Sequence, residues 1–213
     1  MGMFLRRGPA PHRRSLADVA EGTLVKLNEE GTPVEFYVAC HNYEPGLNGN
    51  GKTLLVRKDC CDMRVFSSLN NAYATSDLDE FLNGPYIEIL DTAILSAIGT
   101  TKFYYTPGNG NNTVTTLQRA VFQLSVTELG ERGSYANTEG TALPIASTLR
   151  IAYHNGSACV QWTRTPYTYD LRSAYCLFAN GSLHYNYYDI SYGPRPAFTL
   201  PSAIHVSDDM LIA

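Results

Sequence analysis

The stretch that decides the fold is LRIAYHNGSACVQWTRTPYTYDLRSAYCLFANGSLHYNYYDISYGPRPAFTL, residues 149–200. It divides into short runs rich in aliphatic and aromatic residues, separated by turns built from Gly, Asn, Asp and Pro. These runs predict strands at 149–153, 159–163, 174–178, 183–188 and 197–200. Several short strands in succession favour a compact β-rich region over a helical one.

Further strands are expected upstream of this region. The β-like runs at 23–27 and 34–40 flank a turn-forming cluster and predict a hairpin. Two more strands are expected at 53–57 and 114–124.

Two segments predict helical structure. Ser15 is placed to cap a helical turn. Ser76, with Glu80 in the first turn, predicts a short helix that ends at Asn83-Gly84-Pro85. The predicted order along the chain is strands, then one or two short helices, then strands again. This order indicates a compact α+β fold made mostly of short antiparallel strands.

Composition separates this chain from several protein classes. Of 213 residues, 44% are hydrophobic and only 17% are charged, with 15 Tyr and a net charge of −4. This balance argues against a coiled coil, a disordered chain or a basic nucleic-acid binder. No run approaches the ~18 apolar residues of a membrane span, so we expect neither nucleic acid nor membrane insertion.

The first residues differ from the rest. Arg6, Arg7, Arg13 and Arg14 lie among prolines, which favours an extended basic arm over residues 1–15. The alternatives are a solvated tail and an arm that binds an acidic neighbour. Residues 16–213 are expected to form a single domain.

No catalytic constellation stands out. The chain lacks the GxSxG, GxGxxG, Walker and HExxH motifs, and its five cysteines form no CxxC. We expect reduced, mostly buried thiols, no metal, no cofactor and no enzyme activity. Glu128 and Glu139 could serve a glycosidase as a carboxylate pair, but such a pair is weak support by itself.

The C-terminal part has a restricted alphabet. Residues 163–209 contain no Glu, Lys, Met, Gln or Trp, yet hold seven of the 15 Tyr. Replacing the adenines of an AAY codon for Asn can produce every residue type except those five. This is the pattern expected of a diversity-generating retroelement, and a Tyr-rich binding strand of ordinary ancestry is the alternative. In either case Tyr is suited to contact, because it offers a large amphipathic face at low entropic cost.

Several motifs carry a resemblance to a known family. These motifs are LADVAEGTLVKLNEEGTPVEFYVACHN at 16–42, LDEFLNG at 78–84, VFQLSVTELG at 121–130, EGTALP at 139–144, RIAYHNGSACVQWTRTP at 150–166 and GPRPAFTLP at 193–201. In this order they resemble a domain family of unknown function that recurs in phage and prophage virion proteins. Trp-x-Arg followed by Gly-x-Arg-Pro-Ala is similar to the end of C-type-lectin-like variable domains. One departure is Pro194, where those domains usually have Val.

The resemblance implies a C-type-lectin-like domain with a display region at about 163–200. Its scaffold positions would be Trp162, Arg164, Gly193, Arg195 and Pro196. Its ligand-binding positions would be Tyr167, Tyr169, Asp170, Arg172, Tyr175, His184, Tyr185, Asn186, Tyr187, Tyr188, Asp189 and Tyr192.

Physical chemistry adds expectations for individual residues. Trp162, the single Trp, should be buried with its indole N–H bonded. Arg164 and Arg195 should bind backbone carbonyls or carboxylates behind the display loops, with surface salt bridges as the alternative. Strand alternation sends Tyr185 and Tyr187 to one face and Tyr188 to the other, so some of these rings should belong to the core.

The leading functional hypothesis is a phage virion protein, exposed on tail or capsid, that binds a host-surface glycan or protein through its Tyr-rich end. It would be made and assembled in the bacterial cytoplasm, contact other virion proteins through the basic arm, and form a homo-oligomer, with a trimer suggested by adhesin symmetry. The alternative is a capsid decoration or tail-assembly subunit without ligand binding.

Overall fold

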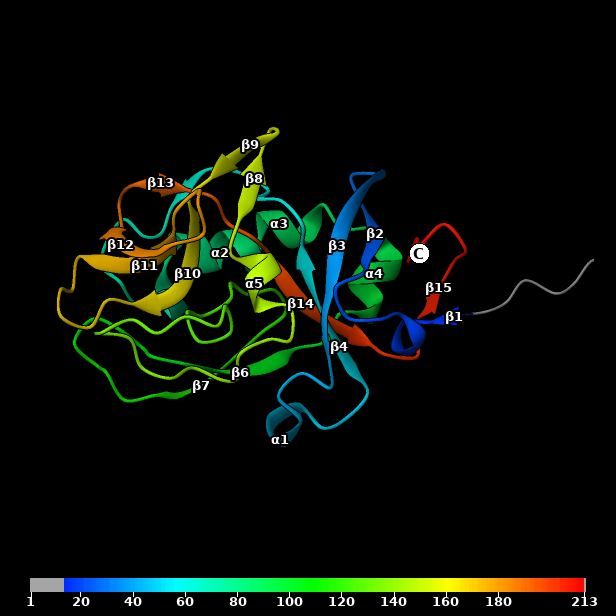
Figure 1. Cartoon of the computed structure of the whole chain (residues 1–213), viewed down its shortest axis with the longest axis horizontal. Helices are drawn as coiled ribbons and strands as arrows, with labels where there is room; N and C mark the ends of the chain where they lie inside the picture. Colours follow the sequence, from blue (N-terminus) through cyan, green and yellow to red (C-terminus); the bar gives the residue numbers. More distant parts are fainter. Residues whose placement is uncertain (1–13, 213) are drawn as a thin grey trace, which may run out of the picture.

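The computed structural model describes residues 14–212, and the basic arm up to Arg13 lies outside the described residues. A four-stranded antiparallel sheet of order β14-β4-β3-β2 organises one half of the molecule (Figure 1). Its strands are β2 (Leu24–Glu29), β3 (Thr32–His41), β4 (Lys52–Arg57) and β14 (Ala197–Pro201). The sheet therefore pairs the beginning of the chain with a strand from near its end.

The predicted hairpin is confirmed as β2 and β3. Val25 and Leu27 on β2, and Phe36 and Val38 on β3, are fully buried, because alternate residues of each strand point into the core. The two-residue turn Glu30–Gly31 has positive φ at both positions, 50° and 75°. This conformation matches the twist of the flanking strands.

A second group of strands occupies the other half. A three-stranded antiparallel sheet has the order β10-β11-β12, where β10 is Gln161–Pro166, β11 is Ser173–Leu177 and β12 is Leu183–Tyr187. Two-stranded pairs surround it: β5 (Arg64–Val65) with β13 (Ser191–Tyr192), β6 (Thr101–Tyr105) with β7 (Thr115–Arg119), and β8 (Ala152–His154) with β9 (Ser157–Cys159).

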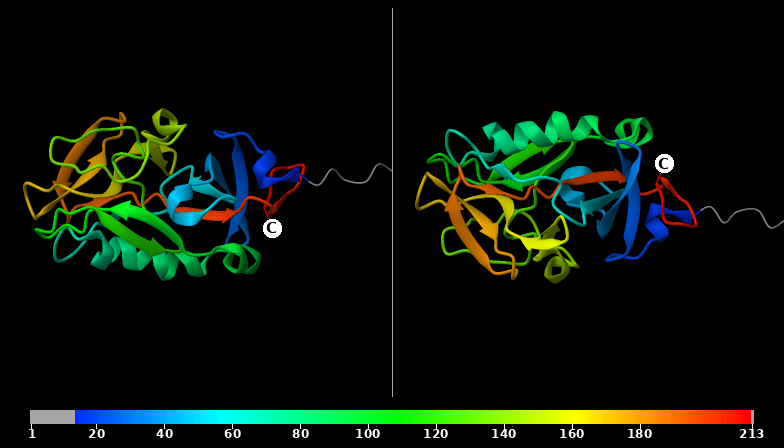
Figure 2. Two further views of the ribbon diagram at one scale, coloured as in Figure 1. Left: turned by 90° about the horizontal axis from the view of Figure 1, so that it is seen from below. Right: turned by 90° about the horizontal axis from the view of Figure 1, so that it is seen from above.

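The helices are short, and α2, α3 and α4 follow one another along one side of the molecule (Figure 2). Ser76 caps α2 as expected, because its hydroxyl accepts a hydrogen bond from the backbone N–H of Asp79 at 3.1 Å. Among residues 14–212 there are five α-helices rather than one or two: α1 (Pro45–Asn48), α2 (Asp77–Asn83), α3 (Pro85–Glu88), α4 (Thr92–Ala97) and α5 (Ala146–Leu149). Two 3-10 turns, η1 (Leu16–Asp18) and η2 (Tyr73–Thr75), complete the helical structure.

Three strand predictions need correction. The run at 159–163 is divided between the end of β9 and the start of β10, because Val160 belongs to neither strand. The run at 114–124 forms a strand only over β7, because Val121, Phe122 and Leu124 leave the ladder to bury their side chains in the core. The run at 149–153 begins as the end of α5, and only its last residues enter β8. Apolar runs of this length do not distinguish a buried loop or helical turn from a strand.

The ends of the described chain lie together. β1 (Arg14–Ser15) pairs antiparallel with β15 (His205–Val206), so these two arm residues belong to the folded unit. Figures 1 and 2 place this pair at one end of the long axis and β11 and β12 at the other. The Tyr-rich strands are therefore remote from the point where the arm joins the fold.

Candidate functional site

Trp162 anchors the base of the site. It is fully buried on β10, and its indole N–H donates to the carbonyl of Arg64 at 3.0 Å, as the sequence predicted. Its ring packs against Phe66 and Tyr192, with centroid distances of 5.6 and 4.9 Å. Trp162 thus joins β10 and β13 to the core.

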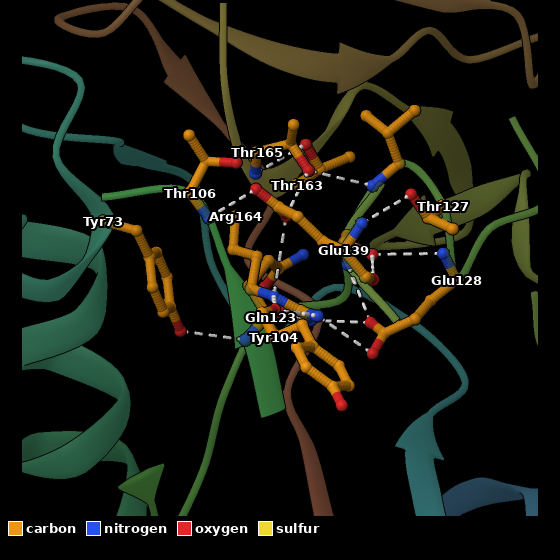
Figure 3. A network of polar contacts seen from close by, with 12 residues as sticks. Tyr73, Tyr104, Thr106, Gln123, Thr127, Glu128, Glu139, Thr163, Arg164 and Thr165 are labelled. Carbon is orange, nitrogen blue, oxygen red and sulfur yellow. Dashed lines mark hydrogen bonds and ion pairs between the residues drawn. The ribbon is translucent and has the colours of Figure 1, made fainter. Parts of the chain in front are cut away.

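Arg164 lies two residues further along β10, at the centre of a buried network (Figure 3). Its guanidinium nitrogens donate to both carboxylate oxygens of Glu128 at 2.6 and 2.9 Å, and to the carbonyl of Tyr104 at 2.8 Å. A bidentate arginine–carboxylate pair of this kind is geometrically specific. The expectation of an internal rather than a surface role for Arg164 is confirmed.

Local sequence explains why Glu128 is in position. The backbone N–H of Glu128 donates to the Ser125 hydroxyl, and the backbone N–H of Ser125 donates to the Glu128 carboxylate at 2.8 Å. This reciprocal pair is a capping box, and Ser125 and Glu128 have the three-residue spacing that such a box requires. Gly130 ends the turn with a φ of 69°. That conformation favours glycine.

Glu139 shares the same interior. One of its carboxylate oxygens accepts from the backbone N–H of Thr106 at 2.7 Å and the other accepts from the Thr165 hydroxyl at 2.8 Å. Burial raises the pKa of Glu139, and the Arg164 cation, 3.8 Å away, opposes that rise. Glu128 and Glu139 are both fully buried, so a substrate cannot reach either carboxylate in the folded protein. The structure therefore does not support these two residues as a glycosidase pair.

Arg195 has a different set of partners. Its guanidinium donates to the backbone carbonyls of Arg57, Leu149 and Lys58 at 2.8, 2.6 and 2.7 Å. It therefore ties β4, the end of α5 and the segment before β14 together, and the expectation that Arg195 binds backbone carbonyls instead of forming a surface salt bridge is confirmed. Gly193 is required nearby, because a Cβ at this position would clash with the Cys60 sulfur.

Above this scaffold the structure brings most of the predicted ligand-binding residues to one open hollow of about 650 Å³. The hollow lies between β12 and the loop that connects β10 to β11. Its lining is Tyr167, Tyr169, Asp170, Arg172, Ser173, His184, Tyr185, Asn186 and Tyr187.

The aromatic rings form a cluster at the centre of this hollow. Tyr167 and Tyr185 stack face to face, with centroids 3.9 Å apart and planes 8° apart. Tyr169, which is 74% exposed, and the half-exposed Tyr185 and Tyr187 present ring surface to solvent. Aromatic surface of this extent outside the core is a common mark of a binding site.

Tyr135 belongs to the same cluster and was missed by the sequence. Its ring lies 5.3 Å from that of Tyr167 and 5.0 Å from that of Tyr169, and its backbone N–H donates to the hydroxyl of Tyr175. It comes from the loop between Gly130 and Glu139, whose Gly, Ser, Tyr and Asn content resembles that of a contact loop. The composition of this loop is the one feature of the sequence that could have marked it as part of the site, because no short-range sequence pattern connects the loop to residues 167–185.

Polar groups surround the rings. The carboxylate of Asp170 accepts hydrogen bonds from the backbone N–H of Arg172 and the hydroxyl of Ser173, and the first of these holds the pKa of Asp170 below its usual range. The Arg172 guanidinium lies over the Tyr187 ring at 5.2 Å. His184 stacks on Phe178 with a centroid distance of 4.3 Å.

The remaining predicted ligand-binding residues lie elsewhere. Tyr188 and the exposed Asp189 border a smaller hollow of about 180 Å³ that they share with Arg172 and Tyr187. Tyr175 is 3% exposed and lies beneath the rings. Tyr192 packs on Trp162 and accepts a hydrogen bond from Asn186, and it lines neither hollow. Tyr175 and Tyr192 therefore support the site from below, and Tyr188 packs partly against the core, as strand alternation led us to expect for some of these rings.

A buried amide sets the shape of the β10–β11 loop. The side-chain nitrogen of Asn71 lies 2.9 Å from the carbonyl oxygen of Ser173 and 3.3 Å from those of Tyr167 and Asp170. Its Oδ1 accepts from the backbone N–H of Asn109 at 2.8 Å. Asn71 thus holds two loops at once, and no sequence pattern had marked it.

Comparison with known proteins gives one match. Residues 50–202 match a family described as "Domain of unknown function (DUF6273)". No curated protein and no solved structure matches the chain. Over residues 14–212, no helix has the length and apolar character needed to cross a bilayer, and no three His, Cys, Asp or Glu side chains gather as a metal site would require.

Proposed function

The chain belongs to this DUF6273 family, and we propose that it is a phage virion protein whose Tyr-lined hollow binds a glycan or protein on the host surface. The observation that carries the proposal is the convergence of exposed rings from the β10–β11 loop and from β12 on one hollow. Tyr169, Tyr185 and Tyr187 are the rings available for contact.

We further propose that the fold is C-type-lectin-like. In support, Trp162 and Arg164 fix β10 from within, and Gly193 to Pro196 lead into β14 beneath the display strands. The variable-looking residues then lie on β12 and adjoining loops, outside a buried scaffold. This division between scaffold and display matches the resemblance described above.

The chemistry of the hollow suits a carbohydrate. Aromatic rings stack on the C–H faces of sugars, while carboxylate, amide and guanidinium groups bond sugar hydroxyls. Asp170, Arg172 and Asn186 supply these groups around the rings. Tyr also dominates protein-binding surfaces, so a host protein is the second ligand class within the same proposal.

The position of the hollow supports a role at the particle surface. β12 and the β10–β11 loop, whose residues line the hollow, lie at the end of the molecule opposite the β1–β15 pair (Figure 1). An arm that binds other virion proteins at the β1–β15 end would leave the hollow facing outward. A homo-oligomer with parallel subunits would multiply weak contacts of this kind.

The test is binding of the purified chain to a glycan array and to whole host cells. Replacement of Tyr169, Tyr185 and Tyr187 together by Ala should weaken binding by roughly ten-fold or more, because exposed aromatic anchors carry much of an interface's free energy. Tyr153→Ala is the matched control, since Tyr153 is 44% exposed on β8 and lies outside the hollow. Binding that survives the triple substitution would contradict the proposal.

The alternative function is a decoration or tail-assembly subunit without a ligand, and the Arg-rich sequence of residues 1–14 favours it. Deletion of residues 1–13 should then abolish incorporation into particles. Under this alternative the aromatic surface is buried between subunits, so the triple Tyr variant should also lose incorporation, whereas a surface that only binds a host ligand should leave incorporation normal.

A further inference from the structure

Two cysteines far apart in the sequence meet in the structure. Cys60 follows β4 and Cys159 ends β9, 99 positions later, yet their sulfur atoms lie 3.5 Å apart. All five cysteines of the chain are free thiols. The cysteine count and spacing in the sequence had not related these two to each other.

The fold holds both thiols in place. The backbone N–H of Cys60 donates to the carbonyl of Tyr153 on β8 at 2.8 Å, and Cys159 pairs with Ala152 on the same strand. On its other side the Cys60 sulfur is confined by Gly193, where a Cβ would clash with it. Cys60 is therefore held against the β8–β9 hairpin.

The two thiols differ in access and acidity. Cys159 is partly exposed, whereas Cys60 is 4% exposed. A hydrogen bond with the Cys60 thiol, followed by the Arg195 cation, lowers the pKa of Cys159 against the effect of burial and of Asp59. The same hydrogen bond, together with burial, raises the pKa of Cys60. Cys159 is thus the more accessible and the more acidic of the two thiols, and the one that an external oxidant meets first.

We propose that Cys60 and Cys159 form a redox-controlled disulfide when the protein meets a small-molecule disulfide. The Cys159 thiolate attacks one sulfur of the oxidant, forming a mixed disulfide and releasing one thiolate. Cys60 then loses its proton and attacks the Cys159 sulfur, which releases the second thiolate. Two cysteine thiols are oxidised and the small disulfide is reduced to two thiols, so atoms and electrons balance.

The bond would join the β8–β9 hairpin, which projects from the molecule in Figure 1, to the segment that follows β4. That segment also contacts the turn before β14, since the backbone N–H of Cys61 donates to the carbonyl of Pro194. Closing a long loop restricts the unfolded chain, which stabilises the fold. A protein made in a reducing cytoplasm and released into an oxidising medium would gain this stability on release.

The other cysteines provide internal controls. Cys61 is adjacent in sequence, but its sulfur lies 3.6 Å from the Pro194 carbonyl oxygen, and its pKa is raised to about 12 by burial. Cys40 and Cys176 are buried, and burial likewise raises the pKa of each to about 12. Selective oxidation should therefore reach Cys60 and Cys159 alone.

The experiment compares the full chain after incubation with oxidised glutathione and with dithiothreitol. We expect the thiols titrated after denaturation to fall from the five of the sequence to three, the mass to fall by two hydrogen atoms, and peptide mapping to join the Cys60 peptide to the Cys159 peptide. The melting temperature should rise by roughly 5 °C or more. Cys61→Ser should behave like the wild type, whereas Cys60→Ser and Cys159→Ser should not form the bond.

Three outcomes would overturn the proposal. They are retention of all five thiols, a bond that maps to Cys61, and a stable glutathione adduct on Cys159 without loop closure. The mass and mapping of the wild-type protein give the answer even if a variant fails to fold. These measurements involve no ligand of the Tyr-lined hollow, so their outcome is independent of whether the proposed function is correct.

Discussion

The network around Arg164 and the hollow around Tyr185 are built on the same three-stranded sheet, yet they use polar residues in opposite ways. In the network, Arg164, Glu128 and Glu139 are fully buried, and each is bonded to its neighbours. In the hollow, Asp170 and Arg172 remain accessible and Tyr rings face solvent. The comparison teaches that the first region should determine stability and the second should determine binding.

The largest effect is expected for Arg164→Ala. Removing the guanidinium leaves Glu128 and Glu139 buried without their cation, which should lower the free energy of unfolding by about 3–5 kcal/mol. Chemical denaturation measures this change. Arg172→Ala is the control from the hollow, where the exposed side chain should contribute less than about 1 kcal/mol. If Arg164→Ala and Arg172→Ala lowered the free energy of unfolding equally, the network would not contribute more to stability than the hollow does.

The next effect is expected for Asn71→Ala, because Asn71 holds the β10–β11 loop from within. Its amide lies within hydrogen-bond distance of the carbonyls of Ser173, Tyr167 and Asp170. Loss of this donor should destabilise the protein by about 1–3 kcal/mol. It should also weaken ligand binding, because the loop that carries Tyr169 loses its support. The exposed Asn112 provides the control as Asn112→Ala. Unchanged binding in the Asn71 variant would show that the loop keeps its shape without this contact.

The pH dependence of stability should have opposite signs in the two regions. Burial raises the pKa of Glu139 above the usual 4.5, so its stabilising contribution is complete below that value and is lost as the pH rises through the folded-state pKa. The backbone N–H of Arg172 lowers the pKa of Asp170 below 3.8, so the contribution of Asp170 is present above that value and is lost as the pH falls through the folded-state pKa.

Unfolding curves between about pH 3 and pH 7 can separate the two contributions. The free energy of unfolding of Glu139→Gln should increase relative to that of the wild type as the pH rises, with a slope of at most about 1.4 kcal/mol per pH unit. The stability deficit of Asp170→Asn should shrink as the pH falls. Parallel curves for all three proteins would contradict the assignment of opposite shifts.

The smallest effect on stability is expected for Tyr187→Ala. Its ring is 48% exposed on β12, the edge strand of its sheet. The free energy of unfolding should therefore change by only about 0.5 kcal/mol. Ligand binding should nevertheless weaken, which a titration on host cells or a bound glycan would detect. A large loss of stability here would mean that the ring belongs to the scaffold, like Tyr175.

Local patterns were sufficient for several elements. The β2–β3 hairpin, the Ser76 cap of α2 and the Ser125–Glu128 capping box all depend on residues within a few positions of one another. Turn chemistry and alternation report such contacts directly. The strand predicted over 114–124 was too long for the opposite reason, since Phe122 is buried by partners remote in sequence, including Tyr43 and Phe103.

The sequence by itself determined the α+β class and nominated most residues of the hollow, because short-range patterning and composition record local conformation and contact chemistry. Only the tertiary structure placed Tyr135 against Tyr167 and Asn71 under the β10–β11 loop, brought Cys60 to Cys159, and set Glu128 and Glu139 around Arg164. Each of these contacts joins residues separated by tens of positions along the chain. Such contacts depend on how strands and loops pack, and a single sequence carries no local signal of that packing.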